Sequence, residues 1–258
     1  MKRQLLTALA ACLLCGSAAA QLSDVAASNM YGKVKSCTFT EAKYTHSEGD
    51  DLFFDENPKE HTEFYDQQGY LTAKDMGNGE RYTFKTTYAA GVPTLIMCYE
   101  ADGSVGKKTV FQKQGAGTLC TGYNARGRVT EKLLYKGNDI TLTAPTSDMT
   151  VTMTLNAKKQ VVAVVCKAPY GITTQSTYHY NEHGALEKVV TNLKRTLGTR
   201  VEEYTHYEYD SHGNWTSRIK WVDDDPVMLE EREIEYYPSA PSAAKKKTTT
   251  GKAGKKRR

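Results

Sequence analysis

Tyr209-Asp210-Ser211-His212-Gly213-Asn214-Trp215 is the clearest of six similar stretches in this chain of 258 residues. Each stretch opens on an aromatic or aliphatic residue followed by an acid or asparagine. In five of the six a glycine stands three positions after that polar residue, and an apolar residue follows two positions later. The other copies begin at Tyr65, Tyr99, Tyr123, Leu155 and Tyr180, so successive starts lie 24 to 34 residues apart. Repetition at such intervals indicates a loose array of one supersecondary unit.

The repeated stretch has the chemistry of a tight turn between two strands. An Asp or Asn can hydrogen-bond its own backbone two residues on, and the later Gly accepts the left-handed backbone that closes such a turn. The flanking Tyr, Leu and Val suit a pleated, half-buried surface. The copy at Leu155 has Lys159 where the others have Gly. A left-handed non-glycine residue costs about 1–2 kcal/mol, so we expect this turn to be either strained or built differently.

The segments between the turns have the patterns of strands. Apolar and polar residues alternate over 81–88 and after the last turn over 215–221. Residues 94–99 and 161–166 are almost continuously apolar, which predicts central strands covered on both faces. Residues 227–237 are rich in charge and predict a solvated edge strand. We therefore predict an all-β fold, an antiparallel meander of long hairpins built from these repeats and forming a curled sheet.

The first residues have the composition of a secretory signal peptide. Two basic residues precede an apolar stretch, Leu5–Leu14, and three alanines precede Gln21. The apolar stretch is shorter than the roughly 20 residues that span a bilayer. The sequence Leu-Ala-Ala-Cys ending at Cys12 leaves lipoprotein modification as an alternative. We expect a signal helix at 1–20, and export to the periplasm or surface of a Gram-negative bacterium.

The last residues are basic and follow a linker rich in Pro, Ser and Ala. We divide the mature chain into a β-repeat domain, 21–238, and a disordered tail, 239–258, because the tail lacks apolar residues to bury. The tail carries eight cations and no acid, which leaves the domain with 24 basic and 30 acidic residues. We predict that the tail contacts an anionic surface through Lys245, Lys246, Lys247, Lys252, Lys255, Lys256, Arg257 and Arg258. A tail that only solubilises, or that folds back on the acidic domain, is the alternative.

Four cysteines remain after removal of the signal peptide: Cys37, Cys98, Cys120 and Cys166. An even number in an exported chain suggests disulfides. Cys98 and Cys120, however, share a face in a meander and are separated by one strand. That places them about 9–10 Å apart, beyond the about 7 Å between alpha carbons that a disulfide allows. We expect buried free thiols at Cys98 and Cys166 and leave a bridge from Cys37 open.

No motif in the sequence points to catalysis, to a cofactor or to a metal. A serine elbow, a metalloprotease helix and a phosphate loop are all missing. Glu202 and Glu203 are adjacent in a strand and point to opposite faces, so they do not form an acid/base pair. His183 and His212 occupy the same variable position of two turns, where any polar residue fits. We expect a protein that is not an enzyme and that holds neither cofactor nor metal.

The repeat resembles the YD-repeat (RHS-type) family of bacterial extracytoplasmic proteins over about residues 60–237. The resemblance implies a β-sheet wrap, a place in the cell envelope, and carbohydrate binding or cell–cell contact. It implies no catalytic residue. This chain has too few repeats to enclose a cargo, its spacing is irregular, and it ends in a basic tail where large members carry a toxin.

We therefore expect a non-enzymatic, exported β-repeat protein of the envelope or cell surface that contacts glycan, an envelope protein or anionic lipid. We expect neither specific nucleic-acid binding nor a transmembrane segment. The candidate binding face is aromatic and consists of Tyr178, Tyr180, Tyr207, Tyr209, Trp215 and Trp221. The alternative is a periplasmic carrier that holds a lipid or small hydrophobic ligand within the curled sheet. A glycan-cleaving enzyme, which needs two facing carboxylates in a cleft, is least favoured.

Overall fold

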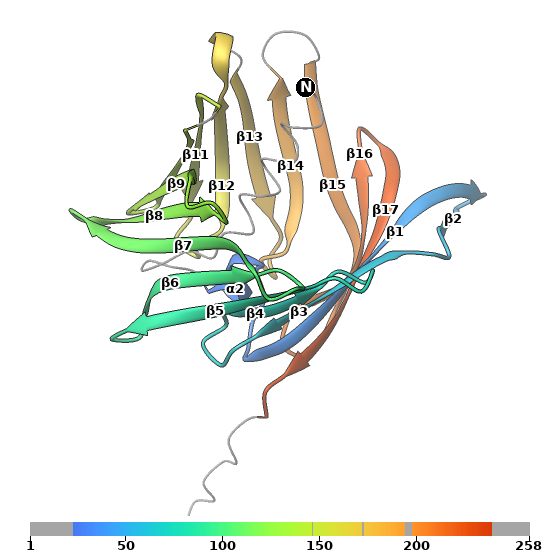
Figure 1. Cartoon of the computed structure of the whole chain (residues 1–258). Coiled ribbons are helices and arrows are strands. Elements are labelled where there is room, and N and C mark those ends of the chain that lie inside the picture. Colours follow the sequence, from blue (N-terminus) through green and yellow to red (C-terminus); the bar gives the residue numbers. More distant parts are fainter. Residues whose placement is uncertain (1–22, 146, 172, 194–197, 239–258) are drawn as a thin grey trace, which may run out of the picture.

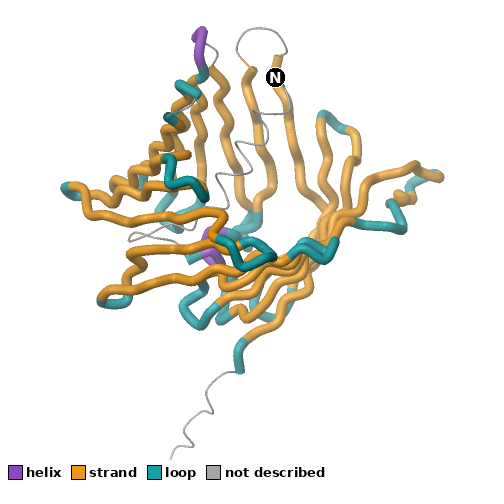
Figure 2. Tube along the Cα trace, in the orientation of Figure 1, coloured by secondary structure: helices purple, strands orange, loops and turns teal. Residues whose placement is uncertain are grey.

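Strands make up almost all of the structure. The computed structural model describes residues 23–238 except 146, 172 and 194–197. Figure 1 shows the strands wrapping around a short helix, α2 (Asp24–Ala27), and Figure 2 shows how little else is helical. Besides α2, the described residues contain only one turn of 3-10 helix, η1 (Pro169–Gly171). The predicted signal peptide, the alternative lipidation site Cys12 and the basic tail lie outside the described residues.

The strands follow the order of the chain, and each pairs antiparallel with its neighbours. The described residues form β1 (Val34–Glu48), β2 (Asp51–Phe54), β3 (Lys59–Tyr65), β4 (Leu71–Asp75), β5 (Arg81–Ala89), β6 (Val92–Tyr99), β7 (Val105–Gln114), β8 (Gly117–Asn124), β9 (Val129–Lys136), β10 (Asp139–Ala144), β11 (Met149–Leu155), β12 (Val161–Lys167), β13 (Thr173–Tyr180), β14 (Leu186–Leu193), β15 (Gly198–Tyr209), β16 (Trp215–Val222) and β17 (Asp225–Tyr236). The prediction of an all-β antiparallel meander is confirmed.

The sheet closes on itself, and the prediction of a curled sheet is wrong in this respect. β1 pairs with β17 on one side and with β3 on the other. Sixteen strands therefore complete a barrel, while β2 forms a hairpin with the C-terminal part of β1. β17 is consequently not an edge strand. β17 pairs with β1 on one side and with β16 on the other. Its residues Glu231, Glu233 and Glu235 point to one face of the wall, while Ile234 and Tyr236 point to the other.

The repeated stretches are turns of one kind. The five turn glycines have φ between 72° and 84°. In each turn the glycine N–H is bonded to the carbonyl of the Asp, Asn or Glu three residues earlier, as at Gly213 and Asp210 (3.1 Å). Lys159 has φ 65° and donates the same bond to Asn156 (2.9 Å). The fourth turn is therefore built like the others, with a lysine in the left-handed region.

The six turns divide between the two ends of the barrel, because each strand reverses the direction of the chain. The turns after β3, β11, β13 and β15 lie at one end, and those after β6 and β8 lie at the other. The N-terminal segment 23–33 crosses the first end, which we call the plugged end. Tyr31 there exchanges hydrogen bonds with Asn214, of 2.6 Å from its N–H and 2.9 Å to its carbonyl. The opposite end is the far end.

The barrel wall has two faces. The face that carries α2, which we call the inner face, holds two hydrophobic clusters. One spans β7 to β12 around Leu133 and Val151, and the other joins α2 to β1, β3 and β17 around Val25 and Cys37. Cross-strand pairs such as Phe111–Cys120, Cys120–Leu133 and Leu142–Val151 keep this face in register around the wall.

The four cysteines among the described residues lie on the inner face as free thiols. Cys37, Cys120 and Cys166 are buried and Cys98 is half-buried. Cys98 pairs with Lys107 of β7, while Cys120 pairs with Phe111 of the same strand, so one strand separates them. The prediction that these two residues share a face without forming a disulfide is confirmed.

Candidate functional site

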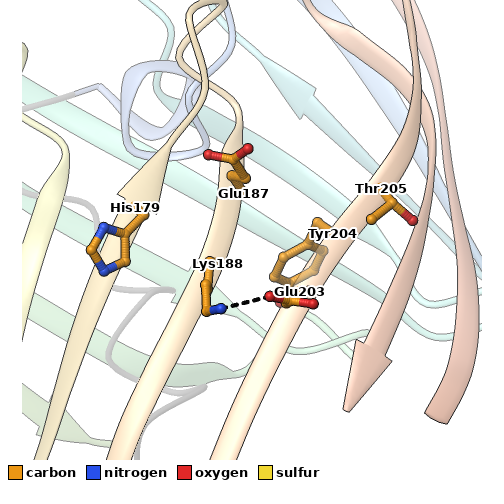
Figure 3. A pocket seen from close by; sticks show the side chains of 6 residues that line it. All are labelled: His179, Glu187, Lys188, Glu203, Tyr204 and Thr205. Carbon is orange, nitrogen blue, oxygen red and sulfur yellow. Dashed lines mark hydrogen bonds and ion pairs between the residues drawn. The ribbon is translucent and has the colours of Figure 1, made fainter. Parts of the chain in front are cut away.

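A pocket of about 510 Å³ lies where the pairing between β14 and β15 ends. Its lining residues, shown in Figure 3, come from β13, β14 and β15: His179, Glu187, Lys188, Glu203, Tyr204 and Thr205. We call it the outer pocket, because His179, Lys188 and Glu203 pair across the strands on the face opposite the clusters.

The pocket exists because two β-bulges interrupt the sheet around it. The β14–β15 ladder runs from Leu193 and Gly198 to Lys188 and Glu203 and stops there. Beyond that point β15 contains a bulge in which His206 has φ 52°. A bulge bends its strand and leaves residues out of the ladder. Backbone polar groups next to the pocket are therefore left outside the ladder, beside the polar side chains that line the pocket.

Charged side chains at the rim of the pocket are already paired with each other. Lys188 Nζ lies 2.7 Å from Glu203 Oε1, and both side chains are about 40% exposed. Figure 3 shows the Glu187 carboxylate directed away from this pair. A glycosidase would need two carboxylates facing each other across the substrate, and Glu187 and Glu203 do not face each other in this way.

One of the predicted aromatic residues lies beside the pocket on the outer face. Trp221 is the cross-strand partner of Glu203, which extends the row of His179, Lys188 and Glu203 onto β16. Its indole N–H donates a hydrogen bond of 2.7 Å to Thr205 Oγ1, a residue of the pocket wall. That bond holds the half-buried indole next to the pocket.

The other five predicted aromatic residues lie on the inner side of the wall. The hydroxyls of Tyr180 and Tyr207 donate to the backbone carbonyls of Val161 and Leu186. Tyr209 stacks on Tyr207 at 5.6 Å between ring centroids. Trp215 is 5% exposed, and Tyr178 packs against the first hydrophobic cluster. The structure thus separates Trp221 from the rest of the predicted face.

The carboxyl group of Glu63 shows how the surroundings on the inner face shift a pKa. Burial alone would raise the pKa of Glu63. Hydrogen bonds from His61, Lys74 and Tyr65, together with the charge of Lys74, outweigh burial and lower that pKa to about 2. Lys74 Nζ lies 2.8 Å from Glu63 Oε1. Glu63 is therefore an ionised, fully paired carboxylate, which suits a structural role.

Within the described residues, histidines, cysteines and carboxylates do not gather into any group of three that could hold a metal ion. The two histidines singled out in the turns lie in different surroundings. The His183 ring packs on Tyr209 (4.5 Å), and the His212 ring stacks on Tyr236 (3.8 Å). No helix in the described part of the chain is long and apolar enough to cross a membrane.

No protein-family model matches the chain, and no curated protein sequence does so either. Among solved structures, a porin-like protein from Bacteroides uniformis is 14% identical over 78% of this chain and 96% of that one, with a TM-score of 0.46. A porin-like protein from Bacteroides vulgatus is 8% identical over 78% of this chain and 98% of that one, with a TM-score of 0.30. A chain of the TcdB2-TccC3-Cdc42 structure matches at 12% identity over 69% of this chain and 10% of that one, with a TM-score of 0.25.

The assignment to the YD-repeat family is wrong. No family model matches the chain, and the sheet closes as a barrel of 16 strands where the resemblance implied a curled repeat sheet. The turn motif itself is present, because its chemistry suits any tight hairpin between half-buried strands. The motif therefore identifies a turn and not a family.

Proposed function

We propose that this protein is a non-enzymatic, exported protein of the bacterial cell envelope that binds glycan at the outer pocket. The observation that carries the proposal is the position of Trp221 beside a polar pocket whose wall is interrupted by bulges. An indole face packs on the apolar face of a sugar ring, while backbone groups and charged side chains bond its hydroxyls. The expected signal peptide supports the location.

Charged side chains on the outer face support an aqueous place within the envelope. Lys108, Lys132, Lys188 and Glu231 alternate along their strands with inner-face residues and so point outward. A lysine directed into lipid at mid-depth costs about 2–4 kcal/mol, and outward charges recur around this wall. The periplasm or the cell surface fits such a face.

A carrier for a lipid or small hydrophobic molecule is the weaker candidate. That function needs open space beside an apolar part of the inner face. Packed side chains of the first hydrophobic cluster occupy the inner face of β7 to β12, with Leu133 2% and Val151 2% exposed. The outer pocket, with paired charges at its rim, suits a hydrated ligand better.

A glycan array probed with purified residues 21–238 tests the proposal. We expect binding that falls about tenfold in Trp221→Ala, equivalent to about 1.4 kcal/mol. Phe53→Ala is the matched control, because Phe53 is an aromatic residue 40% exposed on the distant β2 hairpin and should leave binding unchanged. Equal losses in the two variants, or binding unaffected by Trp221→Ala, would remove the outer pocket from the proposal.

The proposal that the protein is not an enzyme has its own test. Glycans that bind are incubated with the protein and analysed by mass spectrometry, and we expect them to be recovered intact. Shorter products that disappear in the double variant Glu187→Gln/Glu203→Gln would show that the pocket is an active site.

A further inference from the structure

Four cationic side chains form a row along the inner face of β15, β16 and β17. From the far end to the plugged end they are Arg200, Lys220, Arg218 and Arg232. Their side chains become less exposed in the same direction, at 38% for Arg200, 22% for Lys220 and 12% for Arg218. Arg232 ends the row beneath the N-terminal segment, and its Nη2 atom lies 3.5 Å from the Ser28 carbonyl oxygen. We call these four residues the cation row.

The row has more cations than carboxylates. Glu202 is shared by Lys220 and Arg200, at 2.8 Å and 3.1 Å. Glu230 is bonded to Arg218, whose Nε lies 2.6 Å from its Oε2. Four cations thus face two carboxylates.

Arg232 is the cation without an ion pair. Its Nε and Nη1 atoms are buried, and neither has a hydrogen-bond partner among the described residues. The guanidinium instead lies over the indole of Trp215, 3.7 Å from the ring centroid, with Arg218 at 4.0 Å from the same ring. Trp215 therefore holds two guanidinium groups close together, which is costly unless an anion accompanies them.

Among the neighbours of Arg232, Cys37 and Tyr65 supply no negative charge, and Glu230, which does, is bonded to Arg218. Burial raises the pKa of the Cys37 thiol to about 12, so this neighbour stays neutral. Burial, assisted by Glu63, likewise raises the pKa of Tyr65 above its usual range. Burial lowers the pKa of Arg232 to about 10, which leaves it positively charged at neutral pH. A buried donor without a partner calls for an explanation such as a bound ion or water.

We propose that the cation row leads to a binding site for a small oxyanion, a carboxylate or phosphate group, held at Arg232 on the inner face. The unused N–H groups of a guanidinium match the oxygens of both groups. Lys220 and Arg218 lower the electrostatic cost of bringing an anion along the wall toward that position. The site lies on the opposite face from the outer pocket and does not depend on glycan binding there.

Thermal unfolding of residues 21–238 tests the site, with inorganic phosphate or acetate added in place of chloride at constant ionic strength. An anion that binds only the folded state raises Tm, and above its Kd the rise continues with the logarithm of the anion concentration. We expect this rise in the unaltered protein and in Arg126→Met, a control at an exposed turn arginine. We expect Arg232→Met to lose it. Comparing the two anions distinguishes phosphate from carboxylate.

Two results would overturn the proposal: no rise in Tm with either anion, or an equal rise in Arg232→Met. If Arg232→Met does not fold, Arg232→Lys replaces it, because lysine keeps the charge but lacks the planar group of donors. We expect at least a several-fold weaker apparent affinity in that variant, and an unchanged affinity would equally exclude Arg232 as the anion site.

Discussion

The turns at the plugged end and those at the far end share one motif but do different things. At the far end, Gly103 and Gly127 have open space where a side chain would stand. At the plugged end, a Cβ on Gly69 would lie 2.8 Å from Ser23 Oγ, and one on Gly184 would lie 2.5 Å from the Tyr31 hydroxyl. The far-end turns only reverse the chain. The plugged-end turns also form the surface on which segment 23–33 docks, so one local motif has acquired a second, tertiary role.

The largest expected effect comes from Asn214, in the position that follows the turn glycine. Its buried amide exchanges bonds with the Tyr31 backbone and donates to the Tyr236 hydroxyl (2.6 Å). Asn214→Ala leaves several buried groups unpaired and should cost about 2–4 kcal/mol in the free energy of unfolding.

Ser104 occupies the same position in a far-end turn and is exposed. Ser104→Ala should change stability by no more than about 0.5 kcal/mol. Equal effects of the two substitutions in urea unfolding would mean that segment 23–33 does not dock on the Asp210 turn.

Alanine substitutions at the turn glycines give the next largest expected difference in the free energy of unfolding. Each such substitution places a side chain in the left-handed region, at a cost of about 1 kcal/mol. Gly184→Ala must also displace Tyr31, and we expect about 2–3 kcal/mol in total. Gly127→Ala should cost only the first amount. Gly213→Ala should behave like Gly127→Ala although it lies at the plugged end, because a Cβ there meets nothing within 4 Å. A large loss of stability in Gly213→Ala would contradict this account of the turn glycines.

The plugged end should also respond to pH through Asp24. Burial, with a smaller contribution from Glu63 and Asp66, raises the pKa of this carboxyl to about 6, against the opposing hydrogen bond from the Leu71 N–H. Because the folded state then holds the proton more tightly than the unfolded chain, stability is greatest below about pH 4 and falls as the pH rises to about 6.

For a half-buried carboxyl we expect a loss of about 1–2 kcal/mol across this interval. Asp24→Asn keeps an acceptor for Leu71 and should remove the loss. Thermal unfolding of both proteins from pH 4 to 7 measures it. A difference in Tm between them that stays constant over this range would exclude a raised pKa at Asp24.

The smallest expected effect is a gain in stability. Lys159 holds φ 65° in a turn where every other copy has glycine. Lys159→Gly should relieve left-handed strain and stabilise the barrel by less than about 1 kcal/mol, reduced by loss of the exposed bond from Lys159 to Asn138. We therefore expect Lys159→Gly and Gly127→Ala to change the free energy of unfolding in opposite directions, as measured by chemical unfolding. Destabilisation by both would show that the two turns are not equivalent.

The sequence predicts the local structure of this protein well, because the turn motif depends on two residues and their own backbone. Positive φ at Gly127 follows from the spacing alone, whereas at Lys159 the sequence left open a strained turn or a different one, and the structure has the left-handed turn. The shared face of Cys98 and Cys120 follows from strand alternation. These features require no knowledge of residues far away in the chain.

Closure and the sites could not be predicted in the same way. The charges of 227–237 suit a solvated edge, and only the pairing of β17 with β1 makes them one face of a continuous wall. Pairing between residues about 200 positions apart, such as Lys35 and Glu235, leaves no local pattern. The outer pocket depends on the bulge at His206, and the neighbours of Arg232 come from both ends of the chain.

Hydrogen exchange across the β1–β17 pair tests the central claim most directly, since closure of the barrel is what places segment 23–33 on the turns. Exchange measured by mass spectrometry should show amides of 36–43 and 228–235 protected to the same degree as the central pair β11 and β12. The open sheet that the sequence suggests would instead leave the amides of β1 and β17 that face the missing partner strand exchanging within seconds, and that result would contradict the account.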